Sequence, residues 1–139
     1  MTQTTNTTSG MAQGQAAAIP VITWFEIPSS NYDRAIKFYE TVLKTQLNRE
    51  EMDGIAMAVF PHIEGQASGA VVHGAPYTPS DAGTCIYLYT TDLDGALQRT
   101  TQSGGKVVMP KTFLSDCIGY IAMIIDTEGN RIGLHHKPE

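Results

Sequence analysis

The sequence predicts an α+β fold built from two copies of one unit, in which a strand is followed by a helix and three more strands (βαβββ). Two helix-like segments each follow a strand-like segment, and a linker at residues 74–83 separates the two series. The triplet Ile55 to Met57 (Ile-Ala-Met) recurs as Ile121 to Met123 in the second series. We therefore expect two modules, at about residues 21–74 and 84–137, inside one domain.

The composition is typical of one globular domain, here residues 19–139, preceded by a tail. The chain has 139 residues, of which 42% are hydrophobic, enough to bury a core. The net charge of -5 argues against a nucleic-acid partner, and no apolar run approaches the ~20 residues that cross a membrane. Residues 1–18 carry no charged side chain, so we expect a disordered tail rather than an export signal. Without such a signal, we expect a cytoplasmic protein in which Cys85 and Cys117 are free thiols.

Local patterns place the elements of the first module. Apolar residues recur at three- and four-residue steps from Tyr32 to Leu43, which indicates a helix capped by Ser30 or Asn31. Asp53-Gly54 is typical of a tight hairpin turn between two strands. The predicted strands are Val21 to Ile27, Leu47 to Met52, Ile55 to Phe60 and Ser68 to His73.

The second module repeats this order. Asp92 is a capping candidate for a helix that begins at Leu93, and Gly104-Gly105 ends that helix. The turn from Asp126 to Asn130 contains Gly and Asn, which tolerate positive φ, and joins the last two strands. The predicted strands are Thr84 to Thr90, Lys106 to Lys111, Tyr120 to Ile125 and Arg131 to His136.

Alternation along the strands separates a face under the helix from a face that points away from it. Two such curved modules, placed side by side, form a partial barrel around a central pocket, the kind of concave site where small molecules bind. The residues expected under the helices are Phe25, Ile27, Ile86, Leu88, Ile132 and Leu134, and those expected to face the pocket are Trp24, Glu26, Cys85, Tyr87, Tyr89, Gly133 and His135.

Five segments of the chain resemble the vicinal oxygen chelate superfamily, which includes glyoxalase I, bleomycin-resistance proteins and extradiol dioxygenases. The resemblance spans nearly everything from Val21 to Lys137 and implies paired βαβββ modules and a homodimer. The ending Asp-Thr-Glu-Gly-Asn-Arg-Ile-Gly-Leu is similar to a glyoxalase-like subgroup. The five segments are Trp24 to Pro28, Asp33 to Tyr39, Thr91 to Asp94, Gly104 to Val108 and Asp126 to Leu134.

Metal-using members of that superfamily take one ligand from the first strand of each module and a carboxylate-type ligand from the last strand. The first-strand positions fall on Trp24 and Cys85, and the last-strand positions fall on Gly69 and Gly133. The Gly69 assignment can shift by one residue because its strand is short. Trp and Gly side chains cannot bind a divalent cation, and one Cys does not make a site. We therefore expect no metal and no other cofactor.

Six residues are candidates for contact with a ligand in the pocket. Glu26 is the catalytic candidate, as a general base or as an anchor for an amine or hydroxyl; alternatively, it is a structural carboxylate bonded to Arg131 or to a Tyr hydroxyl. The aromatic candidates form a wall for a flat or cationic ligand, or they are ordinary core. Two interpretations are open for Cys85: a nucleophile activated by His135, or a small buried residue. The six candidates are Trp24, Glu26, Cys85, Tyr87, Tyr89 and His135.

The leading functional hypothesis is a metal-independent protein that binds a small organic molecule between its modules. The alternative is a lyase, isomerase or dioxygenase of the same superfamily that uses Glu26 as a general base, or a rearranged metal site of Glu26, His73 and His135. A third class, a module used only for protein contacts, predicts a pocket filled by its own side chains. Under the leading hypothesis the partners are a small molecule and a second copy of the chain, with no nucleic acid and no membrane.

Overall fold

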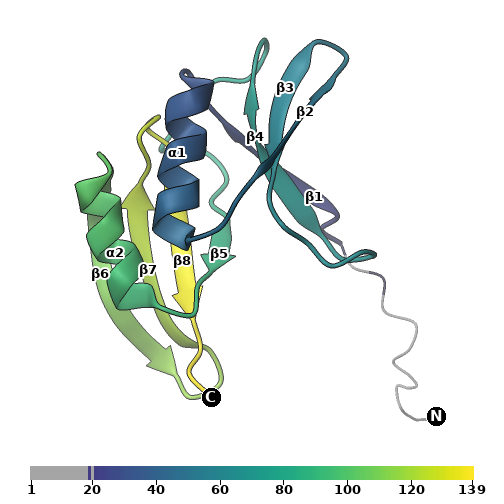
Figure 1. Cartoon of the computed structure of the whole chain (residues 1–139). Coiled ribbons are helices and arrows are strands. Elements are labelled where there is room, and N and C mark those ends of the chain that lie inside the picture. The colour runs from purple at the N-terminus through teal and green to yellow at the C-terminus, as the bar shows by residue number, and fades with distance from the viewer. Residues whose placement is uncertain (1–18, 20) are drawn as a thin grey trace, which may run out of the picture.

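The chain folds into two four-stranded sheets and two helices, which confirms the α+β class (Figure 1). The structure is a computed structural model that describes residue 19 and residues 21–139, so the tail predicted at residues 1–18 lies outside the described residues. Each sheet carries one helix, and within the described residues the sheets remain separate and do not close into a barrel.

The first module has the predicted order of elements. Its helix α1 (Tyr32–Leu43) has the predicted bounds, and Asn31 is the capping residue because its side chain accepts a hydrogen bond from the Arg34 backbone N–H. The β2–β3 turn has positive φ at Asp53 (52°) and Gly54 (80°), as a primed hairpin turn requires. The sheet order is β1-β4-β3-β2, with β1 parallel to β4. The strands are β1 (Trp24–Pro28), β2 (Asn48–Met52), β3 (Ile55–Val59) and β4 (Ser68–His73).

The second module repeats this topology, with sheet order β5-β8-β7-β6 and β5 parallel to β8. The helix α2 (Leu93–Gln102) is capped by Asp92, as predicted. Two strands differ in length from the prediction: β5 is shorter, and β6 continues past Lys111 through register shifts that the sequence pattern did not indicate. The strands are β5 (Tyr87–Tyr89), β6 (Lys106–Ser115), β7 (Gly119–Ile125) and β8 (Arg131–His136).

The two modules share one hydrophobic core because α1 lies beside α2 (Figure 1). Ile27 of the first sheet and Leu134 of the second sheet both belong to this core. Phe38 of α1 is 1% exposed, although the sequence pattern did not predict its burial. Its ring packs against Gly105 of the second module so closely that a Cβ on that glycine would lie 2.8 Å away. No helix in the described part of the chain is long and apolar enough to span a membrane.

The turn between β7 and β8 binds the first module through buried polar contacts. The Tyr39 hydroxyl of α1 donates a hydrogen bond of 2.5 Å to the Asp126 carboxylate. The Asn130 side chain donates to the Pro28 carbonyl at 2.8 Å and accepts from the Ser80 backbone N–H at 3.0 Å. Burial, together with the nearby negative charge of Asp126, raises the pKa of Tyr39 well above its usual range, so this phenol remains a donor. The turn therefore joins α1, β1 and the linker.

Glu128, in the same turn, binds the N-terminus of α1. Its fully buried carboxylate accepts hydrogen bonds from the backbone N–H groups of Ser30 and Asn31, at 2.9 and 2.8 Å, and from Arg34 Nε at 2.8 Å. Burial alone would raise the pKa of Glu128, but the hydrogen bonds from Arg34, Asn31 and Thr127 outweigh it and lower the pKa to about 2. A carboxylate at this position also complements the helix dipole.

Arg99 makes a similar contact at the other end of α1. Its guanidinium on α2 donates to the Val42 carbonyl, with Nε at 3.2 Å and Nη2 at 3.1 Å. The last turn of α1 contains no basic residue of its own. The second module thus supplies a negative group at the start of α1 and a positive group at its end, and both favour the helix dipole.

Replacing Glu128 by Gln keeps the side-chain shape and removes its charge. Because the pKa of Glu128 is lowered from 4.5 to about 2, its stabilising contribution is present above pH 4.5 and is lost as the pH falls toward about 2. We expect Glu128→Gln to lower the free energy of unfolding by about 2 kcal/mol near neutral pH. The loss is smaller than the full pKa shift implies, because solvent around the half-exposed Arg34 screens the ion pair. We expect less than half of that loss at about pH 3.

Urea unfolding of the Glu128→Gln variant and the unsubstituted protein at both pH values measures this difference. Glu64→Gln, in an exposed loop, is the matched control. A loss in the Glu128→Gln variant that does not change with pH would contradict the assigned ion pair.

Candidate functional site

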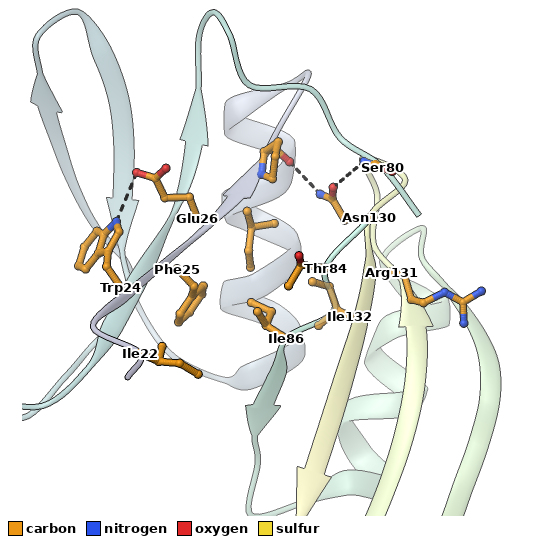
Figure 2. Close-up of a pocket in the computed structure, with 12 residues that line it drawn as sticks. Ile22, Trp24, Phe25, Glu26, Ser80, Thr84, Ile86, Asn130, Arg131 and Ile132 are labelled. Atoms are coloured by element: carbon orange, nitrogen blue, oxygen red, sulfur yellow. Dashed lines mark hydrogen bonds between the residues drawn. The ribbon is translucent and has the colours of Figure 1, made fainter. Parts of the chain in front are cut away.

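The side chains of β1 alternate between the helix and solvent, as predicted. Phe25 and Ile27 pack into the core below α1, whereas Trp24 and Glu26 point to the other side (Figure 2). Trp24 is 42% exposed, compared with 2% for Ile27. We call the side of each sheet that faces away from its helix the open face; Trp24 and Glu26 lie on the open face of the first sheet.

The open face of the second sheet carries three further predicted residues. Leu88 and Leu134 are buried under the helices, while Tyr87 and Tyr89 are about half exposed on the other side. His135 pairs with Tyr89 across β8 and β5, and the two rings meet edge to face at 5.5 Å between centroids. These aromatic groups therefore form a small cluster of their own on the second sheet.

A cavity of about 340 Å³ lies between the modules, bounded by β1, the linker and the start of β8 (Figure 2). Its walls are largely apolar, and Ser80, Thr84, Asn130 and Arg131 supply polar groups. The Asn130 amide already forms hydrogen bonds with the Pro28 carbonyl and the Ser80 backbone N–H. The apolar walls are Ile22, Phe25, Ile27, Pro28, Ile86 and Ile132.

This cavity does not unite the six predicted ligand residues. Trp24 and Glu26 line it, although their side chains point away from its centre, and Cys85, Tyr87, Tyr89 and His135 do not line it. The reason is tertiary: the modules share a core, so the helix-facing sides of β1 and β8 meet at the seam and the open faces turn outward. Thr84, Ile86 and Ile132 were not predicted as pocket residues, because their apolar or neutral character gives no functional signal.

Glu26 is held by neighbours on the open face of the first sheet. The Trp24 indole Nε1–H donates a hydrogen bond of 3.3 Å to the Glu26 carboxylate. Hydrogen bonding to Glu26 also raises the pKa of the Tyr77 phenol. Tyr77 comes from the linker, where no periodicity indicates its contact with this sheet. The bond to a Tyr hydroxyl was one of the alternatives for Glu26, and the carboxylate is exposed rather than buried.

The pairing of β1 with β4 corrects the orientation expected for Gly69. Gly69 pairs with Phe25, and a Cβ built on it would lie 2.5 Å from the Phe25 ring, on the helix side of the sheet. Ser68 and Ala70 pair with Trp24 and Glu26 and share the open face with them. The short strand permits this one-residue shift, and neither side chain is a carboxylate.

The remaining family ligand positions do not fit a divalent cation either. A Cβ on Gly133 would lie 2.3 Å from the Tyr87 ring, which fills the space that a ligating side chain would need. The Cys85 thiol lies 3.8 Å from the neighbouring Ile86 carbonyl. In the part of the chain that the structure describes, no three His, Cys, Asp or Glu side chains are close enough to hold a metal, so His73, His135 and Glu26 do not form the alternative site.

Gly69 has no room for a side chain. A Cβ there would lie 2.4 Å from the Phe25 carbonyl oxygen and 2.5 Å from its ring, so the backbone itself would have to shift. We expect Gly69→Ala to lower the free energy of unfolding by about 2 kcal/mol. Thermal or urea unfolding measures the change, and Gly83→Ala, where nothing lies within 4 Å, should be neutral within about 0.5 kcal/mol. Equal stability of the two variants would contradict the assigned β1–β4 register.

Comparisons with known proteins agree with this architecture. The profile of the Glyoxalase/Bleomycin resistance protein/Dioxygenase superfamily matches residues 21–134. A glyoxalase/bleomycin resistance protein from Albidiferax ferrireducens has a similar structure, with a TM-score of 0.66 and 16% identity over 86% of this chain and 100% of that chain. A glyoxalase family protein from Bacillus cereus gives a TM-score of 0.65 and 18% identity over 91% of this chain and 100% of that chain. No curated protein sequence matches significantly.

Glyoxalase I from Zea mays is also similar, with a TM-score of 0.57 and 18% identity over 81% of this chain. The present chain covers only 44% of the maize chain. These identities are low, so the structural similarity supports the shared fold and leaves the reaction to be argued from the site.

Proposed function

Because the chain belongs to the Glyoxalase/Bleomycin resistance protein/Dioxygenase superfamily, we propose that it binds a small organic molecule between its modules without using a metal ion. The observation that carries this proposal is the cavity of about 340 Å³ at the seam, which has apolar walls and few polar groups. Ligand pockets commonly have volumes of about 300–1,000 Å³ and this mixture of groups. The residues at the family ligand positions support binding without a metal, since an indole and a thiol are poor partners for an oxygen-chelating cation.

The cavity walls indicate the character of the ligand. Phe25, Ile27, Ile86 and Ile132 present apolar surface, which favours a largely apolar body. The Thr84 hydroxyl is available at the edge to donate or accept one hydrogen bond (Figure 2). A ligand with an apolar ring or chain and one hydrogen-bonding end fits these walls best.

Filling the cavity should abolish binding and leave the fold intact. Thr84 is exposed and lies at the edge of the cavity, so Thr84→Phe places a ring across the opening without disturbing the core. Nile red, a neutral apolar dye, should bind the unsubstituted protein saturably with increased fluorescence, and Thr84→Phe should weaken binding at least tenfold. Thr101→Phe, on an exposed position of α2, should bind like the unsubstituted protein.

The same titration tests the role of metal. The dye affinity should be equal before and after treatment with EDTA, because no wall residue of the cavity forms a metal site. Equal dye binding by Thr84→Phe and Thr101→Phe would contradict the cavity as the site. Loss of dye binding on chelation would contradict the metal-free proposal.

We further propose that the protein is a homodimer in a reducing, cytoplasmic environment. The open face of the second sheet exposes Tyr87 and Tyr89 on the edge strand β5, and Val108 on the opposite edge strand β6 is 46% exposed. A second copy would cover this apolar surface. Both Cys85 and Cys117 are free, which suits a compartment where thiols stay reduced.

Analytical ultracentrifugation tests the assembly. A chain of 15.1 kDa should sediment with twice that mass, and Tyr87→Glu, which places a charge in the covered face, should shift the equilibrium toward the monomer. Thr101→Glu on exposed α2 is the control and should remain dimeric. A monomer at all concentrations, or an equal effect of the two variants, would contradict this interface.

A further inference from the structure

A second hollow lies on the open face of the first sheet, on the opposite side of β1 from the seam cavity. Its volume is about 460 Å³. The register of β2 and β3 pairs Glu50 with Met57 and Met52 with Ile55, so these side chains share one face. We call this hollow the β1–β3 groove; its walls are Trp24, Glu26, Glu50, Met52, Met57, Val59 and His62.

The two carboxylates of the groove are held in place by neutral groups. Glu26 accepts a hydrogen bond from the Trp24 indole, and Glu50 accepts one of 2.9 Å from the Asn48 side-chain amide. Within the described residues, neither carboxylate forms a salt bridge, whereas Glu128 and three aspartates do. The hydrogen bonds orient the carboxylates and leave their negative charges uncompensated.

Apart from His62, whose Nδ1 lies 3.4 Å from the Phe60 carbonyl oxygen, the rest of the groove is apolar and adaptable. Trp24 is 42% exposed and Met52 is 59% exposed, so both side chains present apolar surface to the groove. An indole attracts a cation to its face, and methionine side chains adapt to apolar groups of irregular shape. Two carboxylates and an exposed indole in one hollow therefore favour a cation, and the thioethers and Val59 favour a cation that carries an apolar body.

We propose that the β1–β3 groove binds an organic cation, in which an ammonium group contacts Trp24 and Glu26 and an apolar group lies along Met52 and Met57. A bare metal ion would leave the apolar walls unused, and within the described residues Glu26, Glu50 and His62 do not lie close enough together to hold one. A neutral apolar molecule would leave the carboxylates unused. The site is separate from the seam cavity, so this proposal goes beyond the proposed function.

Trp24 is the only tryptophan of the chain, so its fluorescence reports directly on the groove. Benzyltrimethylammonium chloride is the cationic probe, and neopentylbenzene, its neutral carbon analogue, is the control ligand. We expect the cation to change the fluorescence of Trp24 saturably and the neutral analogue to bind at least tenfold more weakly. Saturable binding of both probes with equal affinity would overturn the proposal.

Two variants test the carboxylates. Glu26→Gln and Glu50→Gln should each weaken binding of the cation about tenfold, because each removes a charge and keeps the side-chain shape. Glu51→Gln is the matched control, since Glu51 is the next residue on β2 and its side chain points to the other face. Unchanged affinity in both groove variants, or no saturable signal with the cation, would overturn the proposal. Thr84→Phe should retain cation binding, so the result for the groove does not depend on whether the seam cavity binds a ligand.

Discussion

The turn between β7 and β8 is the contact on which the arrangement of the two modules depends. Three polar side chains at alternate positions of the turn bridge to the first module: Asp126 binds Tyr39, Glu128 binds the N-terminus of α1, and Asn130 binds the carbonyl of Pro28. Buried polar groups are costly unless they are paired, so each partner requires the other to be in place. The modules therefore dock in one orientation, which apolar packing alone would define less sharply.

That orientation decides where hollows form. Because α1 and α2 lie side by side in a common core, the helix-facing sides of β1 and β8 converge and leave the seam cavity between Phe25, Ile86 and Ile132. The open faces are left outside the core, where Trp24 and Tyr87 are both partly exposed. One strand, β1, thus contributes to two different sites through its two faces.

Two glycines, one on each sheet, are packed against aromatic rings. The ring of Tyr87 occupies the space beside Gly133, and Phe25 occupies the space beside Gly69. A side chain at either glycine would collide with an aromatic ring, and because Gly69 faces the helix side of its sheet, Ser68 and Ala70 lie on the open face instead. On the open face of the first sheet, the Glu26 carboxylate is held by Trp24.

The sequence by itself determined the elements that depend on local physics. Helix α1, strand β4 and the turn at Asp53-Gly54 agree with prediction, because apolar period, caps and positive φ are set by neighbouring residues. Tertiary structure alone decided which sheet faces meet. The burial of Phe38, the contact of Tyr77 with Glu26 and the docking of the β7–β8 turn all join residues far apart in the chain, and a local pattern carries no information about such partners.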